Sequence, residues 1–207
     1  MMKITKNKIE ILNGYRRNIF LNASIRALSL LLKKPYPKIF NAIKELEREN
    51  IIKIRKQSHS NICEINLSKE AISFLSFVEK EEAFKAKIPN IDKILEFDSF
   101  LDDIIIVAGS YAKGTQTKKS DLDLVVITKE DVLHKQKLME NQTMLFTPEV
   151  HAVVFSYDDF KKMLMSREPD FGKEVFKNHF IFRNPERYYL IVKEAISNGL
   201  RMENLSY

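Results

Sequence analysis

The spacing of apolar residues in the first third of the chain predicts helices followed by a pair of strands. Helical spacing covers residues 8–20 and 25–32, and Asn22 or Ser24 can cap the second of these helices. Pro35-Tyr36-Pro37 then breaks the chain before a third helix that ends near Asn50. Residues 51–56 and 62–67 follow as strands on either side of a polar tip. The layout is helix, turn, helix and hairpin.

The third helix is predicted to bury one side and expose the other. Ile39, Phe40, Ile43 and Leu46 form an apolar stripe at helical spacing. The opposite side carries mostly Lys, Asn, Glu and Arg. This helix therefore has a polar surface that is available for a partner.

The rest of the chain alternates between strand-like and helix-like segments. Residues 68–97 predict a helical connector, with Ala71, Ile72, Leu75 and Val78 at helical spacing. Apolar runs predict strands over 104–108, 120–127 and 149–155. Helices are expected over 158–165 and through 171–201. The whole pattern predicts an α+β protein.

Composition restricts the class of protein. The 207 residues are 44% hydrophobic, enough for a buried core, and no apolar run approaches the roughly 20 residues that cross a bilayer. The N-terminus lacks the apolar stretch of a signal peptide. The single cysteine, Cys63, excludes an internal disulfide and a cysteine-based zinc site. We expect a cytoplasmic protein with no membrane partner.

Charge divides the chain into a basic front and a mildly acidic remainder. Residues 1–67 contain 14 Lys and Arg residues against five Glu, a net charge of +9, and the remaining residues carry −3. We predict a nucleic-acid-binding domain over 1–67, a helical connector over 68–97 and a second domain over 98–207.

The layout of residues 8–67 resembles the winged helix-turn-helix domains of prokaryotic regulators. The resemblance implies that residues 35–48 enter the major groove of DNA while the hairpin, or wing, follows the backbone. It implies DNA-facing roles for Tyr36, Lys38, Asn41 and Lys44, and phosphate contacts for Lys33, Lys34, Arg55, Lys56 and His59. The alternative is that this helix only packs and its lysines are solvated. Such regulators are often dimers, so a homodimer is possible.

A glycine turn and two aspartates carry the candidate chemistry. Gly109-Ser110 ends the apolar strand abruptly, and a glycine there lets the backbone approach a phosphate closely. Because side chains alternate along a strand, Asp121 and Asp123 share one side while Leu122 enters the core. Two carboxylates so close together repel each other unless a cation lies between them, and Mg²⁺ with bridging phosphates suits that arrangement.

The string GSYAKGTQTKKSDLDLVV resembles the DNA polymerase beta-like nucleotidyltransferase superfamily, in particular its minimal nucleotidyltransferase branch. The resemblance covers about residues 100–165 and implies a mixed sheet followed by C-terminal helices. It implies that Gly109 and Ser110 hold the phosphates of ATP or another NTP. Asp121 and Asp123 would bind Mg²⁺ or Mn²⁺. Lys113 and Ser120 are further candidates for phosphate contacts.

The family uses a third carboxylate, the general base, on a later strand. The matching strand here, residues 149–155, contains no aspartate. Glu149 and His151 share one side of it, and either could act as the base. As a metal ligand, His151 suits Mg²⁺ less well than a carboxylate does.

These features predict a metal-dependent nucleotidyltransferase joined to a DNA-binding winged helix. The expected reaction transfers AMP from ATP to a protein hydroxyl, such as one on a toxin, or to another acceptor. The role would be antitoxin-like or autoregulatory. A second hypothesis is a transcriptional regulator whose nucleotidyltransferase fold senses a nucleotide or a partner without catalysis. In a third, the winged helix contacts RNA or protein.

Overall fold

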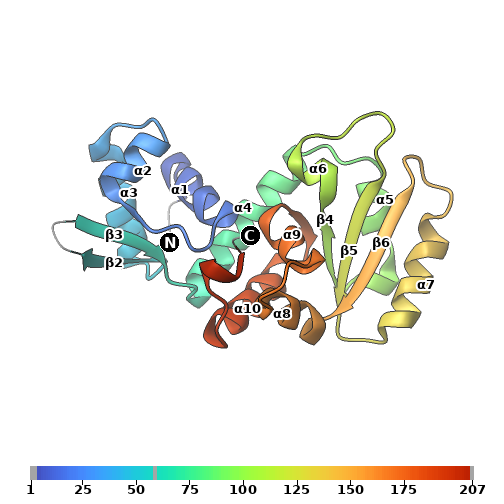
Figure 1. The fold of residues 1–207 in the computed structure, drawn as a ribbon. Helices are drawn as coiled ribbons and strands as arrows, with labels where there is room; N and C mark the ends of the chain where they lie inside the picture. Colours follow the sequence, from blue (N-terminus) through green and yellow to red (C-terminus); the bar gives the residue numbers. More distant parts are fainter. Residues whose placement is uncertain (1–3, 58–59, 206–207) are drawn as a thin grey trace. The chain divides into compact units, whose positions relative to one another are not determined.

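The computed structural model describes residues 4–57 and 60–205, which form two compact units that divide between Val78 and Glu79. The predicted fold class is confirmed: a winged helix-turn-helix precedes an α+β unit that is built on a mixed sheet (Figure 1).

The first unit has the predicted helix-turn-helix and hairpin. Its elements are α1 (Lys6–Arg17), β1 (Ala23–Ser24), α2 (Ile25–Leu31), α3 (Tyr36–Arg48), β2 (Ile52–Gln57) and β3 (Ser60–Ile65). The short strand β1 pairs with β3, which gives an antiparallel sheet in the order β1-β3-β2. The predicted wing is therefore the β2–β3 hairpin. His59, a predicted phosphate contact, lies outside the described residues.

The buried side of α3 differs from the predicted stripe at one position. Ile39, Ile43 and Leu46 are fully buried, as predicted. Phe40 is 36% exposed and its ring lies 5.9 Å from that of Tyr36, so its assignment to the buried stripe was wrong. Ala42 is buried on that side instead. The reason is angular: Ile39 and Phe40 are adjacent on the helix and diverge by about 100°.

Helix α4 (Lys69–Lys85) runs through the division between the two units. Its first part buries Ala71, Leu75 and Val78, as the helical spacing predicts. Glu79, the first residue of the second unit, is fully buried, and its carboxylate accepts hydrogen bonds from the Ile181 amide (3.1 Å) and the Tyr189 hydroxyl (3.2 Å). These bonds satisfy a charged group that would otherwise be costly to bury.

The second unit is built on four strands. Its elements after α4 are α5 (Ile91–Leu95), the 3-10 helix η1 (Asp98–Phe100), β4 (Ile104–Val107), α6 (Gly109–Lys113), β5 (Leu122–Thr128), α7 (Val132–Thr143), β6 (Val150–Ser156), α8 (Tyr157–Met165), α9 (Phe171–Lys177), β7 (Phe180–Arg183), α10 (Pro185–Ser197) and η2 (Met202–Leu205). The sheet order is β6-β5-β4-β7. Strands β5 and β6 are parallel, and the other two pairs are antiparallel.

Helices cover both sides of this sheet (Figure 1). Leu122, Leu124 and Val126 of β5 join a core cluster that includes Ile94 of α5 and Met139 of α7. The alternate residues of β5 point to the other side of the sheet. Asp123 belongs to that second set, so its carboxylate lies at one end of the side opposite the cluster.

Two elements of the second unit were not predicted correctly. Strand β7 lies in the segment 171–201 that was expected to be helical, and it pairs with β4 along the edge of the sheet. Asn184, at φ +53°, and Pro185 separate it from α10. Helix α7 was not predicted at all, because it buries Lys135, Met139 and Thr143 rather than an apolar stripe. None of the described helices is both long and apolar enough to cross a membrane.

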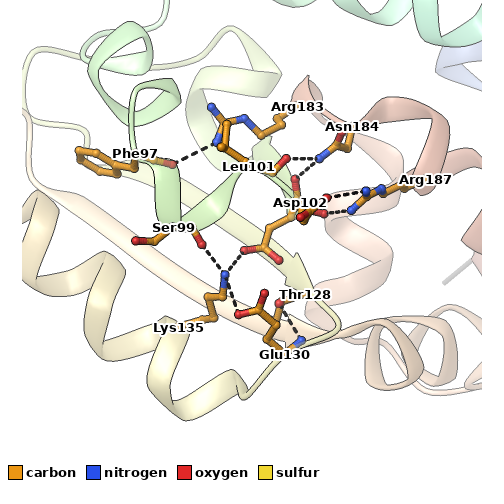
Figure 2. Close-up of polar contacts among 11 residues, drawn as sticks. Phe97, Ser99, Leu101, Asp102, Thr128, Glu130, Lys135, Arg183, Asn184 and Arg187 are labelled. Atoms are coloured by element: carbon orange, nitrogen blue, oxygen red, sulfur yellow. Dashed lines mark hydrogen bonds and ion pairs between the residues drawn. The ribbon is translucent and has the colours of Figure 1, made fainter.

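Lys135 of α7 makes a buried ion pair at the start of β4. Its ammonium lies 2.8 Å from an Asp103 carboxylate oxygen, and the side chains are 4% and 3% exposed. It also donates to the Ser99 carbonyl and pairs with the more exposed Glu130 (Figure 2). Burial acts to lower the pKa of Lys135, but the hydrogen bonds to the two carboxylates outweigh burial and raise the pKa. The lysine therefore stays charged at neutral pH.

We predict that Asp103→Asn lowers the free energy of unfolding of the second unit by about 3–5 kcal/mol, because it leaves the Lys135 charge buried without its main partner. Glu130→Gln removes the exposed partner (62% exposed) of the same lysine and should cost less than about 1 kcal/mol. Urea unfolding, followed by circular dichroism and fitted with one transition per unit, measures both. Equal losses in the two variants would contradict this account of the pair.

Candidate active site and nucleic-acid interface

The closest approach at the candidate active site is between Gly109 and Asp123. Gly109 follows β4 directly and has φ +60°, a conformation that favours glycine. A Cβ atom at this position would lie 1.8 Å from Asp123 Oδ2. The Asp123 carboxylate therefore occupies the space that any side chain at position 109 would need.

Backbone pairing fixes this approach. The Ala108 amide donates to the Asp123 carbonyl (3.0 Å), which extends the β4–β5 pairing to the glycine turn. Helix α6 begins at Gly109 and ends at Lys113, and the residue that caps it, Gly114, has φ +69°. The glycine turn and Asp123, the second aspartate of the pair, are thus brought together where β4 ends and β5 begins.

Asp121 lies just before β5 and is exposed. A turn over residues 117–120 leads into it, in which the Thr117 amide donates to Ser120 Oγ (2.9 Å) and the Ser120 amide donates to the Thr117 carbonyl (3.2 Å). The Ser120 hydroxyl, predicted to contact phosphate or support the site, is engaged in this turn. It orders the loop that carries Asp121.

His151 lies beside Asp123. Strands β5 and β6 are parallel with Asp123 opposite His151, and His151 Nδ1 lies 3.7 Å from Asp123 Oδ1. The histidine side chain is 75% exposed and the aspartate side chain is 33% exposed. Glu149 precedes β6 and is exposed, and its carbonyl accepts a hydrogen bond from the Leu122 amide (2.8 Å). Of the two predicted bases, the histidine is the one that faces the aspartate.

The remaining predicted phosphate contacts, Ser110 and Lys113, both lie on α6. Ser110 is half-buried in the first turn of α6. Lys113, at the end of α6, pairs with Glu174 of α9 at 3.4 Å, with both side chains nearly half exposed. A surface ion pair of this kind is weak and can be exchanged for a phosphate.

The chemistry of these side chains fits a divalent cation. Among the described residues, neither Asp121 nor Asp123 forms an ion pair with Lys or Arg, and the basic group beside Asp123 is the His151 imidazole, which is charged only if it is protonated. Carboxylate oxygens are the donors that Mg²⁺ and Mn²⁺ prefer. Within residues 4–57 and 60–205, no group of three or more His, Cys, Asp or Glu side chains is arranged to hold a metal ion. Phosphate oxygens would have to complete the coordination.

A cavity of about 830 Å³ lies at the far end of β5 and β6, away from the glycine turn. Its lining includes Thr128 and Ser156, the last residues of β5 and β6, and none of the motif residues. Two of its three basic residues are ion-paired, since Arg187 pairs with Asp102 (Figure 2) and Lys161 pairs with two carboxylates, and the third, Lys129, has its ammonium 5.2 Å from the centroid of the Tyr157 ring. The pairing leaves no charge pattern that indicates a ligand.

The predicted DNA contacts fall into two groups. Lys33, Tyr36, Lys38, Asn41 and Lys56 are exposed. The other three are ion-paired within the first unit: Lys34 with Glu10 (3.2 Å), Lys44 with Glu47 (2.8 Å) and Arg55 with Glu64.

The structure also brings a residue to this surface that sequence reasoning missed. A cavity of about 660 Å³ in the first unit is lined by Arg26, Tyr36, Ser60 and Asn61, among others. Arg26 is exposed on α2, beside the helix that was predicted to read DNA. The available signal was a lone basic residue in an otherwise apolar helix.

Residues 88–194 match the family model of the nucleotidyltransferase domain. The chain therefore belongs to the nucleotidyltransferase domain family, as its Gly-Ser and Ser-Asp-Leu-Asp motifs predicted. A solved structure with some similarity is the crystal structure of MepR, a transcription regulator of the Staphylococcus aureus multidrug efflux pump MepA. It is 16% identical with a TM-score of 0.35, over 48% of this chain and 76% of that chain, which is too distant to carry an argument. No curated protein matches the chain.

We predict that Gly109→Ala weakens Mn²⁺-dependent binding of an ATP analogue by at least about tenfold, because the new methyl group displaces the Asp123 carboxylate. Gly114→Ala is the matched control: Gly114 also has positive φ, but a Cβ there meets nothing within 4 Å. Both variants carry the backbone strain, and only the first carries the clash. Equal binding by the two variants, measured by isothermal titration calorimetry, would contradict the importance of this approach.

Proposed function

We propose that this protein is a metal-dependent nucleotidyltransferase that transfers AMP from ATP to a hydroxyl acceptor, and that its winged helix binds duplex DNA. The observation that carries the first part is the placement of Asp123 over Gly109 at a sheet edge where Asp121 also lies, in a chain of the nucleotidyltransferase family. We propose catalytic roles for Asp121, Asp123, Glu149 and His151.

In the proposed reaction, the acceptor oxygen bonds to the α-phosphorus of ATP. The bond from that phosphorus to the bridging oxygen breaks, and pyrophosphate leaves. The proton of the acceptor hydroxyl passes to Glu149 or His151. Asp121 and Asp123 would hold a Mg²⁺ or Mn²⁺ ion, which when bound would supply positive charge to the phosphates and to the leaving pyrophosphate.

The chain's own residues would position the substrate. Asp121 and Asp123 would hold the cation, while the Gly109 backbone and the Ser110 hydroxyl would bind phosphate. Lys113, the last residue of α6, would exchange its exposed partner Glu174 for a phosphate oxygen. Ser120 would act through the turn that it stabilises. Another NTP could replace ATP, because none of these contacts reads a base.

We further propose that the acceptor is a protein hydroxyl, such as one on a toxin, which would give the chain an antitoxin-like or autoregulatory role. The winged helix would contact DNA through the exposed surface of α3 and the wing. The basic front of the chain supports this role, since phosphate contacts supply most of the affinity for DNA. A homodimer would suit a two-fold operator.

One observation favours a second function. His151, rather than a carboxylate, stands opposite Asp123. If the base is inadequate, the nucleotidyltransferase unit would sense a nucleotide or a partner without catalysis, and the chain would act as a transcriptional regulator.

We expect Asp121→Asn/Asp123→Asn to reduce transfer of label from α-labelled ATP by at least about 100-fold, because both cation ligands lose their charge. The assay uses Mg²⁺ and host lysate as the source of acceptor. Asp92→Asn, an exposed aspartate on α5, is the control and should keep wild-type activity. Transfer at the wild-type rate by the double variant would refute the site. DNA affinity that responds to ATP without pyrophosphate release would select the regulator.

For DNA binding, we expect Lys38→Ala/Lys56→Ala to reduce the slope of log affinity against log salt by about 1.8, as two lost phosphate contacts require. The control, Lys137→Ala/Lys193→Ala, removes two exposed lysines from the second unit. Fluorescence anisotropy with a labelled random-sequence duplex gives both slopes. The same slope in both double variants would count against the winged helix as the binding surface.

A further inference from the structure

We infer that His151 is a nitrogen ligand of the cation that Asp123 holds, and that this site therefore selects Mn²⁺ over Mg²⁺ more strongly than an all-carboxylate site does. The inference rests on the proposed function, because it concerns the cation of that same site. It assigns His151 a role in binding the metal, which leaves Glu149 as the candidate base.

The strand register gives the first argument. Asp123 and His151 are direct partners on the parallel strands β5 and β6, so their side chains leave the sheet on the same side. Two donor atoms that each lie about 2.1 Å from one ion are about 3.0 to 3.6 Å apart for ligand angles between about 90° and about 120°. The observed distance of 3.7 Å between His151 Nδ1 and Asp123 Oδ1 is just above that range, so a small movement of the imidazole would bring both atoms to one ion.

The freedom of the ring gives the second argument. The His151 side chain is 75% exposed, so it can rotate toward an ion without leaving a packed position. The Asp123 carboxylate lies beside Gly109, where no side chain blocks it. The exposed imidazole can therefore move toward a cation at this carboxylate with little cost to the fold.

The chemistry of the donors decides which cation is favoured. Mg²⁺ is a hard ion that prefers oxygen ligands and keeps several water molecules. Imidazole nitrogen binds the later transition metals more strongly, and Mn²⁺ accepts a mixture of oxygen and nitrogen donors. Two carboxylates and one imidazole also carry one negative charge fewer than three carboxylates. The nitrogen donor favours Mn²⁺ relative to Mg²⁺, whereas the lower negative charge weakens the binding of both ions.

The protein side chains alone do not complete the coordination of a metal ion, so the experiment must include a nucleotide. No three such side chains are already gathered around one point in the part of the chain that the structure describes. Phosphate oxygens must therefore supply further ligands, and metal binding is measured with an α,β-methylene analogue of ATP present. The full chain is used without a histidine tag.

The experiment detects directly whether a histidine nitrogen coordinates the metal ion. Electron spin echo envelope modulation of bound Mn²⁺ detects a coordinated imidazole nitrogen, and competition followed by the free Mn²⁺ signal gives the ratio of Mn²⁺ to Mg²⁺ affinity. We expect the nitrogen signal in the wild type and in His134→Ala, an exposed histidine of α7 that serves as the control. It should vanish in His151→Ala and His151→Asp, and His151→Asp should lower the affinity ratio by about tenfold.

The outcomes separate this inference from the proposed function. A wild-type spectrum without nitrogen coupling, with an unchanged affinity ratio in both His151 variants, would overturn the role of His151. If Mn²⁺ binding were still lost in Asp121→Asn/Asp123→Asn, the proposed active site would stand. If the double aspartate variant bound Mn²⁺ as tightly as the wild type, the proposed site itself would fall. Because His151 is exposed, circular dichroism should show both variants to be folded.

Discussion

The contact between the Gly109 backbone and the Asp123 carboxylate is the constraint on which the candidate site depends. The pairing of β4 with β5 brings the end of one strand against the beginning of the other, and the missing side chain at position 109 makes room for the carboxylate. The parallel pairing of β5 with β6 then sets His151 beside the same carboxylate. Three chain segments thus converge at one edge because of backbone hydrogen bonds, before any ligand is considered.

Carboxylates at the two ends of the strands of this sheet have opposite surroundings. At the end where β4 begins, Asp102 and Asp103 are neutralised by Arg187 and Lys135 (Figure 2). At the other end, Asp123 faces only an exposed imidazole in the described structure. A carboxylate that no Lys or Arg neutralises remains available to bind a cation. The fold therefore provides stability at one end and leaves the other available for chemistry.

The features that were predictable from the sequence are those whose determinants are local. The glycine turn, the strand that carries Asp123, and the helix-turn-helix spacing each depend on residues within a few positions of one another. The core cluster and the partner of Asp123 were less accessible. The register between β5 and β6 sets His151 rather than Glu149 against the aspartate, and no periodicity in the sequence encodes that choice.

The incorrect predictions for β7, α7 and Phe40 also arise because contacts between distant parts of the chain determine the structure. Strand β7 is four residues long, and its partner β4 lies more than 70 positions earlier in the chain, so its pairing leaves no local pattern. Helix α7 buries a lysine, which is acceptable in the interior because Asp103, Glu130 and the Ser99 carbonyl meet its ammonium group. Phe40 has the hydrophobicity of a core residue but the wrong angle on α3. In each case tertiary structure overrides local preference.

Helix α4 has a practical consequence for anyone who wishes to separate the two units. The division between them falls inside a continuous helix, between Val78 and Glu79, rather than in an irregular linker. A fragment that begins beyond the helix would lose the Glu79 carboxylate, and the Ile181 amide and the Tyr189 hydroxyl would each lack the acceptor that they have in the intact chain. A fragment that ends at Val78 would stop in the middle of a helical turn. Truncation would therefore confound loss of function with loss of folding, and the contributions of the units are better dissected by point substitutions in the intact chain.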